Sequence, residues 1–286
     1  MLLLDRLGVS QGTTGRGEGN VLRGDAPGGR AVWLELAARF PDAVKLREKG
    51  SLTLFEGDGA HALAAELEDD AVVVDDPQTV EPALAPGLPP AVFVPTDMQV
   101  DAQAATIAMA AEVPFRVAHV TQALPDRVLA GGEWIEADAV VLATGVDAVE
   151  LDVRPRKGQL VALGPAPGLV TRKLIDAAYP AAIASIIEEA LTGEVWVGSS
   201  RQDTWTVEGV DDAITAAMLE RARGWVPALA GLPVTRAWFG YRPYRPGGPF
   251  VGRLDSGVWA ITGHEGRGVG LGPLHGRQLA QALNAS

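Results

Sequence analysis

Residues 137–145, ADAVVLATG, contain a continuous apolar run that ends in Thr144 and Gly145. An unbroken apolar run of this length is typical of a parallel strand that is buried on both faces of a sheet. Ligands of such sheets bind at the carboxyl ends of the strands. A second apolar run, MLLLD at residues 1–5, also predicts a buried strand and ends in Asp5. The two runs therefore favour an α/β layer with a ligand at the end of residues 137–145.

Helical periodicity predicts helices at residues 29–40, 59–70, 101–112, 211–229 and 273–283. Alternating or apolar runs predict strands at residues 51–57, 91–95, 115–120, 157–164, 169–175, 205–209, 235–246, 250–254 and 258–263, and a hairpin around Gly131 and Gly132. Residues 181–200 fit a helix or a hairpin, and LTGE ahead of VWVGSS favours the hairpin. The expected fold class is mixed α/β, a Rossmann-like layer interleaved with a mainly antiparallel sheet domain.

The composition excludes several classes of function. A net charge of −12 argues against binding to nucleic acid or to an anionic membrane. The absence of cysteine excludes disulfides, iron–sulfur ligation and a cysteine nucleophile within this chain, and it fits a cytoplasmic protein. The four histidines lack metal-ligand spacing, and no apolar run predicts a membrane span. Neither a G-x-S-x-G nor a G-x-x-x-x-G-K-[ST] motif occurs.

Four sequence pieces occur in an order that resembles one enzyme family. They are LLLDRLGVSQGTTGRGEGN, ADAVVLATG, RPRKGQLVAL with GEVWVGSSRQ, and WFGYRPYRPGGPFVG with TGHEGRGVGLGP. The ordered set resembles the D-amino acid oxidase (DAO)/glycine oxidase family of FAD-dependent oxidoreductases from residue 2 to about residue 283. The segments GTTGRGEGN, GSSR and GHEGRG look most like those of the flavin subunits of bacterial heteromeric opine, hydroxyproline and cyanide-forming amine dehydrogenases.

The resemblance implies FAD as the cofactor and two discontinuous domains. The FAD-binding domain would comprise residues 1–45, 112–150 and 245–286, and the substrate-binding domain residues 46–111 and 151–244. The implied cofactor contacts are Asp5, Arg6, Thr13, Thr14, Arg16, Gly17, Gly19, Asn20, Val120, Thr144, Gly145, Gly263, His264, Gly266, Arg267, Gly268, Val269 and Gly270. No residue is expected to act as an acid or base, because the substrate hydrogen passes to the flavin as hydride in this family.

Each implied contact has an alternative interpretation. Asp5 would accept hydroxyl hydrogens of the adenosine ribose, or it caps the turn after its strand. Residues 12–20 would pass the FAD phosphates and the flavin ring, or form a flexible surface loop. Residues 263–270 would lie along the pyrimidine side of the flavin, where backbone N–H groups and a helix N-terminus stabilise negative charge. His264 is either structural or a hydrogen-bond partner of the flavin.

Arg242 in GYRP is the first candidate for binding substrate. The resemblance implies that it binds the substrate carboxylate, and a guanidinium suits this because it donates two parallel hydrogen bonds. The alternative is a surface arginine on a strand. Tyr179 is a second candidate, with a core tyrosine as its alternative. The implied substrate is an amino acid or a related carboxylate-bearing amine, and the implied partners include a second subunit or a homo-oligomer.

Two departures from the family pattern affect the expected cofactor site. The family begins with a strand, a G-x-G-x-x-G turn and a helix, and this chain starts at the strand that follows. Three hypotheses follow: an upstream start that supplies this N-terminal unit, a truncated protein that binds FAD poorly, or a non-catalytic or split subunit that a partner chain completes. In RPYRPGGPFVG, Gly247 stands where the family has an acid, which puts the geometry of that turn in question.

Overall fold

The computed structural model of the chain describes residues 1–24, 26–67, 70–179, 186–203 and 209–285. Almost all of the strand expected at residues 205–209, and residues 181–185 of the ambiguous segment, lie outside these ranges. The chain divides into two compact units. Unit 1 contains residues 1–46, 100–156 and 241–286, and unit 2 contains residues 47–99 and 157–240.

The bounds of these units differ from those of the two expected domains most clearly at residues 100–111. Residues 100–111 were expected in the substrate-binding domain, but they belong to unit 1. They form helix α4 (Ala102–Ala110), which packs on the short helix α2 (Pro41–Val44) and on the 3₁₀ turn Thr14–Arg16. Asp101 caps α4 by accepting a hydrogen bond from the Ala104 N–H at 2.9 Å.

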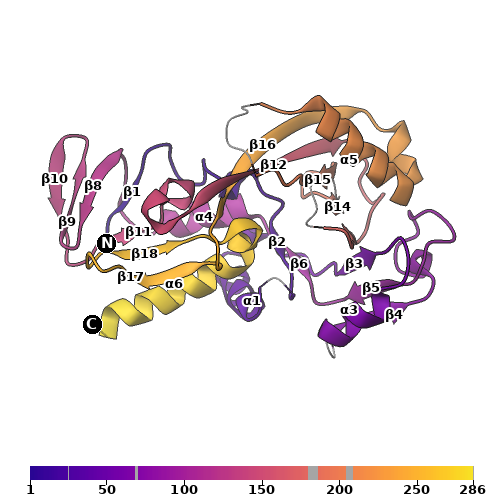
Figure 1. Ribbon diagram of the computed structural model, residues 1–286, viewed down its shortest axis with the longest axis horizontal. Helices are drawn as coiled ribbons and strands as arrows, with labels where there is room; N and C mark the ends of the chain where they lie inside the picture. The colour runs from indigo at the N-terminus through magenta and orange to yellow at the C-terminus, as the bar shows by residue number, and fades with distance from the viewer. Residues whose placement is uncertain (25, 68–69, 180–185, 204–208, 286) are drawn as a thin grey trace. The chain divides into compact units, whose positions relative to one another are not determined.

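Unit 1 contains two small sheets with parallel pairing and a hairpin sheet. Strand β1 (Leu3–Asp5) pairs in parallel with β7 (Phe115–Val117). Strand β11 (Val141–Leu142) pairs in parallel with β18 (Trp259–Thr262), which also pairs antiparallel with β17 (Phe250–Arg253). The hairpin sheet contains β8 (Val120–Leu124), β9 (Arg127–Ala130) and β10 (Glu133–Glu136). Strand β2 (Asn20–Val21) and helix α1 (Gly29–Arg39) complete the unit with helix α6 (Gly268–Ala285), which runs along β17 and β18 (Figure 1).

Strands β1 and β11 are more exposed than the sequence predicts. Leu2 and Leu3 are 43% and 38% exposed, and Val141 is 40% exposed, whereas a strand buried on both faces was expected. The reason lies in the pairing: among the described residues, β1 pairs only with β7, and β11 pairs only with β18. Each strand therefore has an open edge, and only two residues of the expected run 137–145 form a strand.

Unit 2 is built around an eight-stranded, mainly antiparallel sheet. Its order is β16-β12-β15-β14-β13-β3-β5-β4, and β13 pairs in parallel with β3. The strands are β3 (Ser51–Leu54), β4 (Val72–Val74), β5 (Ala91–Val94), β12 (Arg154–Leu163), β13 (Lys173–Asp176), β14 (Ile186–Glu189), β15 (Val195–Gly198) and β16 (Val234–Tyr244). Residues 186–198 form the expected antiparallel hairpin, with Gly193 in the left-handed region at its turn. Strand β6 (Met98–Gln99) and helix α3 (Ala60–Leu67) complete the unit.

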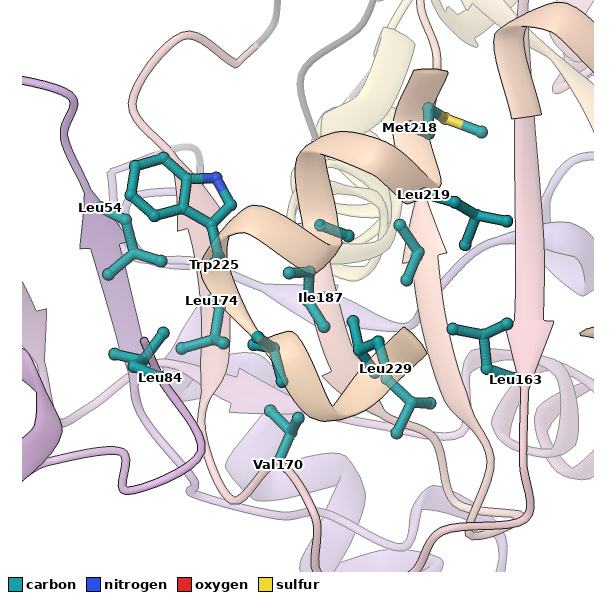
Figure 2. Close-up of a cluster of buried hydrophobic side chains, with 14 of the residues drawn as sticks. Leu54, Leu84, Leu163, Val170, Leu174, Ile187, Met218, Leu219, Trp225 and Leu229 are labelled. Atoms are coloured by element: carbon teal, nitrogen blue, oxygen red, sulfur yellow. The ribbon is translucent and has the colours of Figure 1, made fainter. Parts of the chain in front are cut away.

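Helix α5 (Asp212–Trp225) covers one face of this sheet. Asp211 caps the helix by accepting hydrogen bonds from the N–H groups of Ala213 and Ile214 at 2.9 and 3.2 Å. Its inward side chains, including Met218 and Trp225, pack on strand residues such as Leu163 and Leu174 (Figure 2). Alternate strand residues point to this face, so the core follows the period of two that a half-buried strand requires.

Helix α6 (Gly268–Ala285) begins earlier than expected. The sequence predicts a start at Pro273, since proline favours the first turn, yet the helix starts five residues before it inside the glycine run. Within this run, Gly270 packs closely on another part of unit 1, because a Cβ there would lie 2.4 Å from Ala26 Cβ.

No helix among the described residues is long and apolar enough to cross a membrane.

Candidate functional site

The carboxyl ends of the parallel strands in unit 1 lie close together. Arg6, directly after β1, forms an ion pair of 2.9 Å with Asp147, which follows β11. Thr262, the last residue of β18, donates a hydrogen bond from Oγ1 to the carbonyl of Gly145 at 3.0 Å. Three predicted positions therefore meet at one edge: the end of β1, the turn at Thr144 and Gly145, and the start of the C-terminal glycine run.

Asp5 at the end of β1 caps the turn that follows it. Its Oδ1 accepts hydrogen bonds from the N–H groups of Leu7 and Gly8 at 2.7 and 2.9 Å. The side chain is exposed, and Oδ2 retains its capacity to accept a hydrogen bond. The structure thus contains the capping arrangement, and the same carboxylate still offers one oxygen to a ligand hydroxyl.

The loop between β1 and β2 is anchored at several points. Thr13 donates from Oγ1 to the carbonyl of Tyr241 at 2.6 Å, and residues Thr14–Arg16 form a 3₁₀ turn that ends at Gly17. Gly19 has φ +78°, and a Cβ there would lie 1.9 Å from the carbonyl oxygen of Val100. The backbone geometry therefore explains Gly19 without a ligand.

Among the described residues, the buried polar atoms of this loop that have no hydrogen-bond partner include Ser10 Oγ and Asn20 Oδ1. The Asn20 side chain uses its amide nitrogen to donate to Glu18 Oε2 at 2.9 Å. Buried polar atoms are normally satisfied, so these two oxygens suit a hydrogen-bonding ligand or ordered water.

His264 lies at the start of the C-terminal glycine run and contacts a second histidine. Its Nε2 lies 2.9 Å from Nδ1 of His275 on α6, so one ring donates to the other. Burial, together with His275 and Arg267, lowers the pKa of His264 to about 4. Burial and Arg267 also lower the pKa of His275. At neutral pH both rings are uncharged, and His264 has a structural partner within the protein.

The turn Glu265–Arg267 between His264 and α6 is held by a buried arginine. Arg156 Nη1 lies 2.6 Å from Glu265 Oε1, and its guanidinium stacks 3.6 Å from the ring centroid of Tyr244. Tyr244 also forms an isolated antiparallel bridge with His264. Glu265 has φ +53°, an uncommon conformation for a residue other than glycine. The ion pair therefore fixes a strained turn next to the glycine run.

The other C-terminal positions are explained largely by packing. Gly263 has φ +80°, and a Cβ there would lie 2.8 Å from Arg245 Cβ; a Cβ on Gly270 would lie 2.4 Å from Ala26 Cβ. Val269 accepts a hydrogen bond from the indole of Trp33 at 2.8 Å. Gly266 lies in the turn before α6, and Gly268 is its first residue.

The two predicted substrate contacts lie in different units. The boundary between the units falls inside β16, after Gly240. Arg242 is half-buried in the last part of this strand, which belongs to unit 1. Tyr179 lies after β13 in unit 2, where its N–H donates to the carbonyl of Asp176 at 2.8 Å. Val120 begins β8 of the hairpin sheet, opposite Ala130. The proposed roles of these three residues remain predictions.

The glycine-rich turn after Arg242 is regular despite its departure from the family pattern. Pro246 and Gly247 occupy its two central positions, and the Gly248 N–H donates to the carbonyl of Arg245 at 3.1 Å. Gly247 has φ +81°, which matches the proline–glycine pattern of a type II turn. Arg245 also donates from Nε to the carbonyl of Leu151 at 3.1 Å. Gly247 therefore supports this turn through its backbone conformation.

Sequence reasoning missed the residues that hold this site together. Arg156, Tyr244 and His275 carry no local motif, because their partners lie far along the chain. Trp33, which donates to the carbonyl four residues before Pro273, has no local signal either, because it lies more than 200 residues away in the chain. Within the described residues, no group of three metal-ligating side chains occurs.

The site chemistry fits parts of an elongated ligand with hydroxyl groups and a polar ring. Asp5 Oδ2 suits a sugar hydroxyl, and Ser10 Oγ and Asn20 Oδ1 need hydrogen-bond partners. A Cβ on Gly12 or on Gly145 would meet no atom within 4 Å, so the backbone at both positions faces open space. These features agree with the polar groups of FAD.

Comparison with known proteins identifies the family of this arrangement. The family described as DAO, FAD dependent oxidoreductase, matches residues 1–282. Glycine oxidase from Pseudomonas aeruginosa is 27% identical over 161 residues, which cover 52% of this chain and 43% of that protein. The match with this curated relative thus spans less than half of the relative's length.

Solved structures share the fold. Glycine oxidase from Bacillus cereus ATCC 14579 has a TM-score of 0.87 at 20% identity, and the match covers 99% of this chain and 88% of that one. Iminodiacetate oxidase from Chelativorans sp. BNC1 has a TM-score of 0.79 at 20% identity, with 100% and 89% coverage. At these identities the likeness establishes the fold alone.

Proposed function

The chain belongs to the DAO family of FAD-dependent oxidoreductases, and from this premise we propose that it oxidises the C–N bond of an amino acid or a related carboxylate-bearing amine. FAD, the cofactor of this family, supplies the hydride acceptor at flavin N5. The observation that carries the proposal is the meeting of the β1, β11 and β18 ends in unit 1, joined by the Arg6–Asp147 pair and the Thr262–Gly145 hydrogen bond. Ligands of parallel sheets bind at such an edge.

The residues of this chain would hold the cofactor in three ways. Asp5 accepts a ribose hydroxyl through Oδ2. Ser10 and Asn20 offer their unsatisfied oxygens from the anchored loop. The N–H groups at the start of α6 and the positive end of its dipole would stabilise negative charge on the flavin ring. The Arg156–Glu265 pair holds the turn that aims these N–H groups.

Arg242 would bind the substrate carboxylate. Its guanidinium offers two parallel hydrogen bonds, which orient a carboxylate more strictly than a lysine does. The half-buried position on β16 reduces competition from water. Orientation is the main contribution that the protein makes here, because a correctly placed α-hydrogen needs no protein acid or base in the hydride step.

One structural observation favours a second candidate function. Strands β1 and β11 each have an open edge with exposed apolar side chains among the described residues. A non-catalytic or split subunit that a partner chain completes, as the sequence suggests, agrees with these edges. The two candidates differ in whether this chain alone retains FAD.

The visible spectrum of the purified 286-residue chain distinguishes the two candidates. The proposed oxidation predicts a stoichiometric yellow flavin that survives desalting. A colourless chain that gains flavin only together with a partner chain would favour the second candidate. In an FAD-competent form of the protein, Arg242→Ala should raise KM for an amino acid at least tenfold, with Arg253→Ala on β17 as the matched control. An unchanged KM would remove Arg242 from the substrate site.

A further inference from the structure

A groove of about 620 Å³ lies in unit 2, and none of its lining residues is among the expected cofactor contacts. It is lined by the residues after β3, by the segment before β5 and by the C-terminal half of α5. Its apolar wall includes Phe55, Leu88 and Trp225. The volume falls in the range of small-molecule sites, which are mostly apolar with a few polar groups.

Gly224 in the groove wall has no structural explanation. It lies inside α5, its φ is not left-handed, and the helix ends at Val226 without using it as a cap. A Cβ at Gly224 would meet no atom within 4 Å, so close packing does not require glycine either. Glycine inside a helix costs up to about 1 kcal/mol relative to alanine. Because glycine has no side chain, its presence at this position leaves the groove wall open.

The polar part of the groove carries net negative charge. Arg221 is neutralised, because its guanidinium binds the buried carboxylate of Asp176 and lies 2.9 Å from Glu56 Oε1. Glu220, also in the wall, has no ion-pair partner among the residues that the structure describes. The groove lining therefore contains two carboxylates, Glu56 and Glu220, and one guanidinium that is already paired, so a positive ligand is favoured over a negative one.

We propose that this groove binds a small amphipathic cation, a primary ammonium on an aliphatic or aromatic body. The body packs on Phe55, Leu88 and Trp225, over the open face of Gly224. The ammonium lies beside the Glu220 carboxylate and neutralises its charge, because Arg221 is already paired with Asp176 and Glu56. The inference stands on unit 2 alone and is independent of the proposed oxidation.

Calorimetric titration of the full chain with straight-chain primary amines from butylamine to octylamine tests the proposal. One site is expected, with affinity that rises by up to about fourfold for each added methylene group. Octanoate should bind at least tenfold more weakly than octylamine at low salt. Because Glu220 is exposed, added salt should weaken octylamine binding.

Matched variants separate the two parts of the site. Gly224→Leu fills the groove and should abolish binding of octylamine and of octanol, whereas Gly231→Leu, whose side chain also enters open space, should leave both unchanged. Glu220→Gln should weaken octylamine binding about threefold to fivefold and leave octanol unchanged. Glu66→Gln on α3 is the control for a lost surface charge.

Several outcomes would overturn the proposal. They are the absence of saturable amine binding, equal binding of octanoate, or octylamine binding that survives Gly224→Leu. A dimer in sedimentation that Gly224→Leu dissociates would assign the groove to a second copy of the chain and also reject a small cation as its ligand. The thermal unfolding of Glu220→Gln and Gly224→Leu, compared with the parent chain, shows that both variants are folded.

Discussion

Trp33 donates its indole N–H to the carbonyl of Val269 at 2.8 Å, and so supplies the hydrogen bond that Pro273 cannot make. Val269 lies four residues before Pro273 inside α6, and proline has no backbone N–H to donate. Trp33 on α1 is only 2% exposed, so the bond is buried. This side chain lets α6 continue from Gly268 through Pro273 to Ala285.

Replacement of this indole should therefore destabilise the protein. Trp33→Phe keeps most of the apolar surface and removes the donor, which should lower the free energy of unfolding by about 1–3 kcal/mol. Urea denaturation followed by far-UV circular dichroism measures the change. In a Pro273→Ala background the backbone regains its N–H, so the same Trp33→Phe change should cost less. Equal costs in the two backgrounds would contradict this role.

A second prediction concerns the contact between α6 and the segment before α1. A Cβ on Gly270 would lie 2.4 Å from Ala26 Cβ, whereas a Cβ on Gly272, two residues along the same helix, would meet nothing within 4 Å. Gly270→Ala should cost about 1–3 kcal/mol through overpacking. Gly272→Ala should instead stabilise by up to about 1 kcal/mol. Thermal unfolding of the pair checks the sign, and similar shifts for both variants would contradict the predicted contact.

The same helix shows where local sequence signals succeed and where they do not. The start of α5 was predictable, because Asp211 caps it within three residues. The start of α6 was not, because the donor that permits Pro273 inside the helix lies more than 200 residues away in the chain. The hairpin at residues 186–198 was predictable from its own turn at Gly193.

The candidate site also contains some features that local sequence signals predict and others that they do not. Asp5, Thr144 and Gly145 each follow an apolar strand, so their meeting at one edge was predictable from the pattern of parallel strands. The Arg156–Glu265 pair joins residues 109 positions apart and has no local signal. The exposure of β1 and β11 was also not predictable from their apolar residues, because it depends on which strands pair with them.

A third prediction is a pH dependence that arises from His264. Its pKa is lowered to about 4 in the folded protein, below the usual value of 6.5, so the folded state favours the neutral ring. The stabilisation is complete above pH 6.5 and is lost as the pH falls toward 4, because the unfolded chain binds the proton first. The loss is at most about 3 kcal/mol, since one pKa unit corresponds to 1.36 kcal/mol.

Urea titrations between pH 7.5 and 4.5 measure this dependence. His264→Asn should flatten the decline, although it also lowers the stability at pH 7 by removing the contact with His275. His61→Asn, at an exposed histidine on α3, is the matched control and should leave the slope unchanged. The same slope in the parent and in His264→Asn would show that other groups cause the pH dependence.

The last prediction follows from the open edges of β1, β7 and β11. Unpaired strand edges with exposed apolar side chains favour pairing between chains. Val117 on β7 is 62% exposed and lies opposite Asp5 of β1. A lysine on such a strand opposes edge-to-edge pairing, so Val117→Lys should lower the concentration-dependent association of the purified chain, measured by sedimentation velocity.

The matched control is Ile107→Lys on α4, which adds the same charge on a helix, where the replaced side chain is 48% exposed. Because both variants change the net charge equally, only a difference between them reports on the edges. Equal effects of the two substitutions, or a parent chain that stays monomeric at every concentration, would show that these edges do not drive association.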